Sequence, residues 1–103
     1  MTRYSTGYGC YEITPTPGQP QVAHCHGFFV RYDRRGQGLA HQLKADQNRQ
    51  LKCEGYDFAT CTVDGENHNQ QKVLKKAGWH KISEFQNSKT GGVTLIYGYN
   101  ISL

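Results

Sequence analysis

Long apolar runs are missing from this sequence of 103 residues. No uninterrupted stretch of about 18 apolar residues occurs, which excludes a membrane-spanning helix. No apolar run near the N-terminus is typical of a signal peptide either. Hydrophobic residues make up only 36% of the chain and the mean hydropathy is -0.75. We therefore expect one globular domain over residues 1–103 with a modest core, in a cytoplasmic protein without a membrane partner.

Paired cysteine motifs are also lacking. The four cysteines, none of them in a C-x-x-C pair, are Cys10, Cys25, Cys53 and Cys61. Reduced and mostly buried thiols are therefore expected.

His24 and His26 flank Cys25, but alternation along a strand turns Cys25 to the opposite face, so we expect no metal there. No activating pattern accompanies Cys25 or Cys61, which argues against a nucleophilic cysteine.

The excess of positive charge is small. The chain has 12 basic and 8 acidic residues and a net charge of +4. This balance suits a phosphate-bearing ligand, whereas a nucleic-acid binder usually carries a denser basic stripe. One local cluster contains Lys72, Lys75, Lys76 and Lys81. It fits a solvated face, or a face that contacts a nucleotide phosphate.

Proline is scarce and confined to residues 14–20, which we predict to be a turn or loop. The other patterns predict strands over 8–13, 21–30, 58–63, 79–85 and 93–101, and helices over 39–54 and 67–77. A strand–helix–strand unit predicts a parallel pair with a right-handed crossover, and the last two strands fit an antiparallel hairpin. The expected fold is α/β, with a mixed, mostly antiparallel sheet around a central parallel βαβ unit.

The first predicted helix has an imperfect apolar face. Leucine and alanine residues recur at helical spacing, and Gln47 interrupts them. The apolar members of this face are Leu39, Ala40, Leu43 and Leu51.

A glycine-rich turn precedes this helix. Gly36 and Gly38 let an anion approach the backbone, and the first amide groups of a helix have no internal partner. Arg34 and Arg35 add positive charge. The alternative is a tight turn in which the glycines are present only because its backbone requires a positive φ. The P-loop pattern is absent, and the dinucleotide fingerprint fails because His41 stands where glycine is required.

Two motifs carry a resemblance to a known family. Residues 35–40 read R-G-Q-G-L-A, which matches [RQ]-x-x-G-x-[GA]. Downstream, Val63 and Asn67 precede V-L-K-K-A-G-W at residues 73–79, similar to V-x-x-x-N followed by L-Y-x-K-x-G-F. In these features the chain resembles the GNAT N-acetyltransferases, over about residues 22–99.

The resemblance implies an acyl-coenzyme A N-acyltransferase fold and acetyl-coenzyme A as co-substrate, with no metal. The pantetheine arm would pair with the end of one strand, and the pyrophosphate would lie on the glycine turn. The implied cofactor-binding residues are Phe28, Phe29, Val30, Arg35, Gly36, Gln37, Gly38, Leu39, Ala40, Asn67 and Lys76. Asn67 would lie near the thiol, and Lys76 near the phosphate and adenine.

The implied reaction is attack of a primary amine on the thioester, with a base to take the proton. His24 and His26 share one face of a strand and titrate near neutral pH, so they are the candidate bases, with Glu12 a weaker one. A backbone N–H near Val30 would stabilise the oxyanion. Leu74 stands where many relatives have a tyrosine acid, which leaves Asn67, a water or another tyrosine for that role.

Three functions follow from the sequence. The first is an N-acetyltransferase acting on an unidentified amine, a small molecule or a protein. The second is a catalytically weak GNAT-fold module that binds acyl-coenzyme A or a partner protein. A nucleic-acid binder is the third and least favoured. We expect an N-terminal part shorter than in the family, with the acceptor site open or completed by a second copy in a homodimer.

Overall fold

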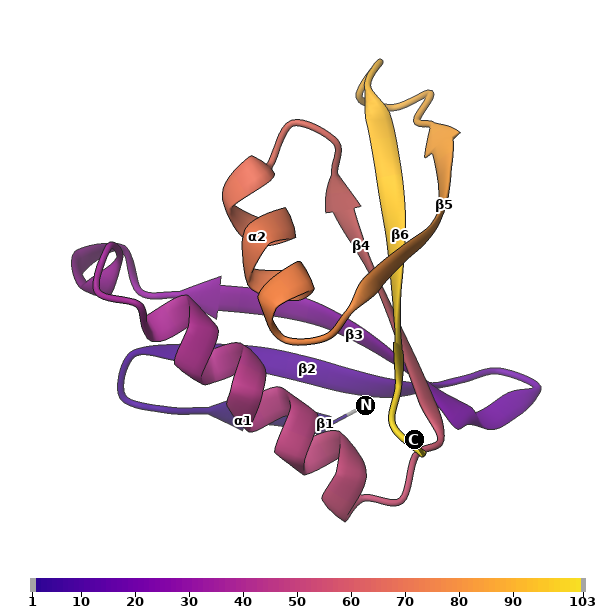
Figure 1. Cartoon of the computed structure of the whole chain (residues 1–103), viewed down its shortest axis with the longest axis horizontal. Helices are drawn as coiled ribbons and strands as arrows, with labels where there is room; N and C mark the ends of the chain where they lie inside the picture. Colours follow the sequence, from indigo (N-terminus) through magenta and orange to yellow (C-terminus); the bar gives the residue numbers. More distant parts are fainter. Residues whose placement is uncertain (1, 103) are drawn as a thin grey trace.

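The computed structural model describes residues 2–102, which form one six-stranded mixed sheet with both helices on the same face (Figure 1). The strands are β1 (Thr2–Ser5), β2 (Gly9–Thr16), β3 (Gln19–Val30), β4 (Phe58–Asp64), β5 (His80–Gln86) and β6 (Val93–Asn100). The helices are α1 (Leu39–Cys53) and α2 (His68–Lys76), and a short 3-10 turn, η1 (Tyr32–Arg34), follows β3. Neither helix of the described chain is long and apolar enough to cross a membrane.

The strand order is β1-β2-β3-β4-β6-β5, and β3 and β4 are the parallel pair in this order. The remaining neighbours are antiparallel, including the predicted hairpin of β5 and β6. This confirms the predicted fold class. Pairing of β3 with β4 covers only Val22–His24 and Phe58–Thr60. Beyond these residues the two strands diverge (Figure 1), which opens the sheet near its centre.

The prediction of a loop at residues 14–20 was wrong in part. β2 continues to Thr16, and β3 begins at Gln19, so the turn holds only Pro17 and Gly18. Pro15 is tolerated because β1 pairs with β2 no further than Ile13. The missing N–H of Pro15 therefore removes no hydrogen bond between these two strands. Gly18 supplies the positive φ, +78°, that the tight turn requires.

β1 was not predicted. Its four residues are mostly polar and exposed, and it lies at the edge of the sheet, so the sequence shows no apolar alternation there. It forms because β2 offers an unpaired edge to residues 2–5. β1 therefore forms because it pairs with β2, and not because its own residues favour a strand.

The core fills the space between the sheet and the helices. Leu43 and Leu51 of α1, Leu74 of α2 and Trp79 after α2 are fully buried. Gln47, predicted to interrupt the apolar face of α1, is itself 0% exposed, and its neighbour Lys44 is 2% exposed. Two polar side chains therefore lie inside the core, and the burial of Lys44 was not predicted. Of the four thiols, which are free, those of Cys25 and Cys61 are buried.

Candidate functional site

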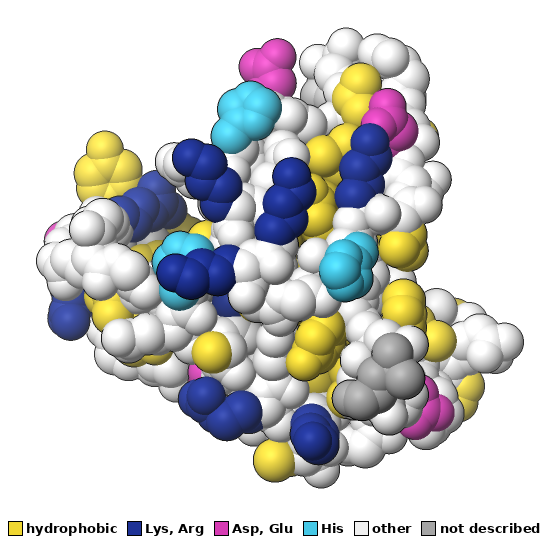
Figure 2. All heavy atoms as spheres, in the orientation of Figure 1, with side chains coloured by type: hydrophobic (Ala, Val, Ile, Leu, Met, Phe, Trp, Pro, Cys, Tyr) yellow, Lys and Arg dark blue, Asp and Glu magenta, His cyan; other side chains and the backbone are white. Residues whose placement is uncertain are grey.

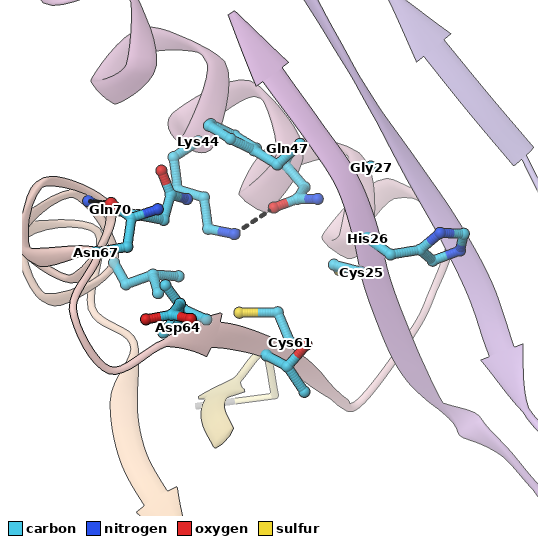
Figure 3. Close-up of a pocket in the computed structure, with 13 residues that line it drawn as sticks. Cys25, His26, Gly27, Lys44, Gln47, Cys61, Asp64, Asn67 and Gln70 are labelled. Carbon is cyan, nitrogen blue, oxygen red and sulfur yellow. Dashed lines mark hydrogen bonds between the residues drawn. The ribbon is translucent and has the colours of Figure 1, made fainter. Parts of the chain in front are cut away.

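Two neighbouring cavities lie at the opening beside the end of β3. The outer one, of about 620 Å³, lies between the end of β3, the glycine turn and the first turns of both helices. The inner one, of about 340 Å³, lies between β3 and β4 under α1 and α2 (Figure 3). Phe28, Asn67 and Gln70 line both cavities, so an elongated ligand could extend from one into the other.

The glycine turn forms one wall of the outer cavity. Gly36 has φ +82° and Gly38 has φ +73°, and an added Cβ would meet nothing within 4 Å at either position. Gly38 is the N-cap of α1, and no side chain caps this helix. The amide groups of the first turn are therefore free of a side-chain partner, as an anion site at a helix N-terminus requires.

Positive charge surrounds this turn. Arg34, Arg35 and Lys72 line the outer cavity, and its described lining includes no acidic residue. Figure 2 shows Lys and Arg side chains spread over the helix-bearing face, with the acidic groups mostly at its margins. The field at the outer cavity therefore favours a ligand with negative charge.

Arg35 also connects the turn to the strand. Its Nε donates to the carbonyl oxygen of Val30 at 3.0 Å. Its guanidinium lies 5.2 Å from the ring centroid of Phe29 and 5.3 Å from that of Tyr32. This side chain fixes the end of β3 relative to the turn, a role that a flexible lysine would fill poorly.

Most of the cofactor residues implied by the resemblance line the outer cavity together. They are Phe28, Phe29, Val30, Arg35, Gly36, Gly38, Leu39, Ala40 and Asn67. Gln37 and Lys76 line neither cavity, and Lys76 lies at the C-terminal end of α2, far along the helix from the turn. Lining residues missed in the sequence are His41, Asn69, Gln70 and Val73, whereas Lys72 belongs to the basic cluster for which a phosphate contact was one of two predictions. Helical spacing from Asn67 could have found Gln70 and then Val73, since residues three and four apart share a face.

Asn67 lies where the two cavities meet. It is the N-cap of α2, and its Oδ1 accepts from the backbone N–H of Gln70 at 3.1 Å. The cap keeps the side chain at the first turn of α2, within the lining of both cavities.

Lys44 and Gln47 extend from α1 into the inner cavity (Figure 3). The Nζ of Lys44 donates to Oε1 of Gln47 at 2.6 Å and lies 4.0 Å from the ring centroid of Trp79. Burial lowers the pKa of Lys44, and the Cys61 and Cys25 thiols only partly oppose that shift. Burial raises the pKa of Cys25 to about 12 and also raises that of Cys61, so both thiols are neutral near pH 7.

His24 and His26 share the other face of β3, as predicted from their spacing. Their rings stack with centroids 5.6 Å apart. Nδ1 of His26 lies 3.1 Å from Oε2 of Glu12, and its Nε2 lies 2.7 Å from Oγ1 of Thr14. Burial, then the neighbouring His26, lowers the pKa of His24. His26 contributes to the lining of the inner cavity, but its side chain points away from it (Figure 3), so the strand separates the imidazole from Lys44.

Leu74 is fully buried and lines the inner cavity. Within residues 2–102, no tyrosine lines either cavity. The described residues also contain no group of three His, Cys, Asp or Glu side chains that could hold a metal ion.

The chain matches a family model described as "Acetyltransferase (GNAT) domain" over residues 9–96. No protein of curated function matches its sequence at a significant level.

Many solved structures have a similar fold. A Bacillus subtilis acetyltransferase in complex with CoA is 17% identical, with a TM-score of 0.79 over 90% of this chain and 68% of that one. A GNAT family acetyltransferase from Elizabethkingia anophelis with acetyl-CoA bound is 15% identical, with a TM-score of 0.80 over 90% and 68%. The ribosomal-protein-S18-alanine N-acetyltransferase of Escherichia coli is 16% identical, with a TM-score of 0.76 over 97% and 66%. These likenesses show the fold, and the chain spans about two thirds of each of those structures.

Proposed function

Because this chain belongs to the GNAT acetyltransferase family, we propose that it transfers an acetyl group from acetyl-coenzyme A to a primary amine. One observation carries the proposal: an uncapped helix N-terminus, a glycine turn and three basic side chains border a cavity that continues into the gap between β3 and β4. A phosphate-bearing ligand with a long, thin arm suits both the charge and the shape of this space.

In this proposal the pyrophosphate binds the amide groups of residues 36–40, with Arg34 and Lys72 beside it. The pantetheine arm follows β3 at residues 28–30. These residues have no partner in β4, so the backbone groups on that edge are available to the arm. The thioester then reaches the junction of the two cavities, next to Asn67.

The acceptor amine approaches from the face of β3 that carries the histidines. His26 accepts the amine proton on Nε2 once the Thr14 hydroxyl, now 2.7 Å away, releases this nitrogen, and Glu12, 3.1 Å from Nδ1, holds the ring and stabilises the imidazolium. The amine nitrogen bonds to the carbonyl carbon, and a backbone N–H near Val30 stabilises the oxyanion. The carbon–sulfur bond then breaks, and the departing thiolate takes a proton from solvent, because Leu74 has none to give.

Calorimetric titration with coenzyme A and acetyl-coenzyme A tests the binding step, and release of free thiol in the presence of amines tests the transfer. We expect micromolar affinity for both ligands, and thiol release with at least one amine from a panel of polyamines, amino acids and peptides. His26→Gln should bind acetyl-coenzyme A normally and release thiol more slowly. Absence of any binding of coenzyme A would refute the proposal.

The second candidate is a module that binds acyl-coenzyme A or a partner protein without turnover. Leu74 and the absence of tyrosine from the described cavity lining favour it, since the proton of the leaving group then lacks a protein donor. Normal binding without thiol release for any amine would support this candidate. The homodimer and the cytoplasmic location stay predictions, and size-exclusion chromatography with light scattering tests the first.

A further inference from the structure

Lys44 has a buried amino group without an anionic partner. Its side chain is 2% exposed, and none of the ion pairs found among residues 2–102 includes it. Its hydrogen-bond partner is the neutral amide of Gln47, and the rings of Trp79 and Phe28 lie near its Nζ. A buried ammonium normally requires a charged partner, because desolvation is costly.

Gln47 adds an unsatisfied donor. It is 0% exposed, its Oε1 accepts from Lys44, and its Nε2 has no hydrogen-bond partner among the described residues. Both side chains line the inner cavity. Two buried donors therefore border the same space, and neither has an acceptor oxygen that carries negative charge.

The other titratable groups that line the inner cavity do not neutralise Lys44. They are Cys25 and His26 on β3 and Cys61 and Asp64 on β4, while α2 and its cap contribute only uncharged side chains. The thiols are neutral near pH 7, and the imidazole points away (Figure 3). Asp64 is exposed, and its Oδ1 accepts from the backbone N–H of Glu66 at 2.8 Å. Burial therefore favours the neutral amine, and an anion that pairs with the protonated form would have to come with a ligand.

We propose that Lys44 and Gln47 form a carboxylate-binding subsite, and that the preferred donor is a coenzyme A thioester whose acyl group ends in a carboxylate. The inner cavity shares Phe28, Asn67 and Gln70 with the outer one, so an acyl group on a cofactor bound in the outer cavity would lie next to this subsite. Its volume of about 340 Å³ also exceeds what the methyl group of acetyl fills. The inference rests on the proposed binding of coenzyme A in the outer cavity, and it specifies the acyl group.

Calorimetry with coenzyme A, acetyl-coenzyme A, malonyl-coenzyme A and succinyl-coenzyme A tests this subsite. For the unmodified chain we expect one of the two carboxylate-bearing thioesters to bind about tenfold or more tightly than acetyl-coenzyme A, as expected for one charge-assisted hydrogen bond. Lys44→Met keeps the length of the side chain and removes the charge, so this ratio should fall to about one. Lys52→Met, an exposed position at the other end of α1, should keep it.

Gln47→Glu is the second variant. It places a carboxylate oxygen where Oε1 now lies, 2.6 Å from Nζ of Lys44, and so supplies the missing anion from the chain itself. We expect this variant to bind coenzyme A normally and to lose the preference for carboxylate-bearing thioesters. Retention of the preference would contradict the subsite even if Lys44→Met failed to fold.

The remaining outcomes are distinguishable. If coenzyme A binds but neither carboxylate-bearing thioester binds more tightly than acetyl-coenzyme A, the subsite is refuted and the proposed function stands. If coenzyme A does not bind, the proposed function fails first. Glycine and β-alanine titrated into the complex with acetyl-coenzyme A test the other source of a carboxylate. Binding of either amine that is lost in Lys44→Met would assign the carboxylate to the acceptor and overturn its assignment to the acyl group.

Discussion

Substitution of Gly38 by alanine separates an anion site from an ordinary tight turn. Gly38 has φ +73°, and its added Cβ would meet nothing within 4 Å, so the variant suffers backbone strain without a clash. A left-handed conformation costs an L-residue roughly 1–2 kcal/mol, and the stiffer unfolded chain returns about 0.4–1 kcal/mol. The net loss of stability should be about 1 kcal/mol, which lowers Tm by roughly 4–8 °C in a chain of this size.

The loss of affinity should be larger than this strain implies. Gly38 caps α1, and the new methyl group would project at the helix N-terminus that we assign to the pyrophosphate. Loss of one charge-assisted hydrogen bond from a backbone amide weakens binding by roughly 1.5–3 kcal/mol, or about 10- to 100-fold. Calorimetry with coenzyme A measures this effect directly.

Gly18 provides a matched control. Its φ is +78°, an added Cβ would also meet nothing within 4 Å, and it lies in the hairpin turn between β2 and β3 at the opposite end of β3 from the glycine turn (Figure 1). Gly18→Ala should lose as much stability as Gly38→Ala and keep the affinity for coenzyme A. Equal affinities in the two variants would show that Gly38 serves only the turn, and would refute the assigned anion site.

Three further predictions concern stability. Gly98→Ala should cost about 1–3 kcal/mol in urea unfolding, because the new Cβ would lie 2.6 Å from Cζ of Phe58, and it should leave coenzyme A binding unchanged. Asn48→Ala removes the oxygen that accepts from Nε1 of Trp79 at 2.9 Å, so thermal unfolding should show a loss of about 1–3 kcal/mol; an unchanged Tm would mean that water replaces the amide. Burial lowers the pKa of His24 below 6.5, so the unfolded chain takes up a proton first as the pH falls below about 6.5 and stability declines there. Urea unfolding at several pH values should show a smaller decline for His24→Gln, and an equal decline would contradict the assignment.

Local sequence was sufficient for most elements. α1 begins after Gly38 and α2 after Asn67, both as predicted to within a residue, because glycine and asparagine are local signals at helix ends. The spacing of His24 and His26 placed both on one face of β3 for the same local reason. The fold class followed from the order of these elements, since a strand–helix–strand unit leaves few alternatives.

Local sequence signals failed where pairing or packing with another part of the chain determines the structure. β1 exists because β2 offers it an edge, and Pro15 lies in a strand because no neighbour needs its N–H. Gln37 belongs to the matched motif but lies outside both cavities, while Lys72, three residues after Asn69, lines the outer one. A sequence motif is defined by positions along the chain, whereas a residue lines a cavity only if the fold brings its side chain to that cavity.

The order of the elements from β2 onward, the glycine turn and the resemblance to the family could be predicted from the sequence, because they depend on neighbours along the chain. The separation of β3 from β4 after three pairs, and the placement of Lys44 and Gln47 in the space between them, became known only from the fold. From the sequence, Gln47 interrupts the apolar face of the helix, and nothing marks Lys44 as buried. Their burial depends on how α1 packs over two strands from different parts of the chain, and no local pattern encodes that packing.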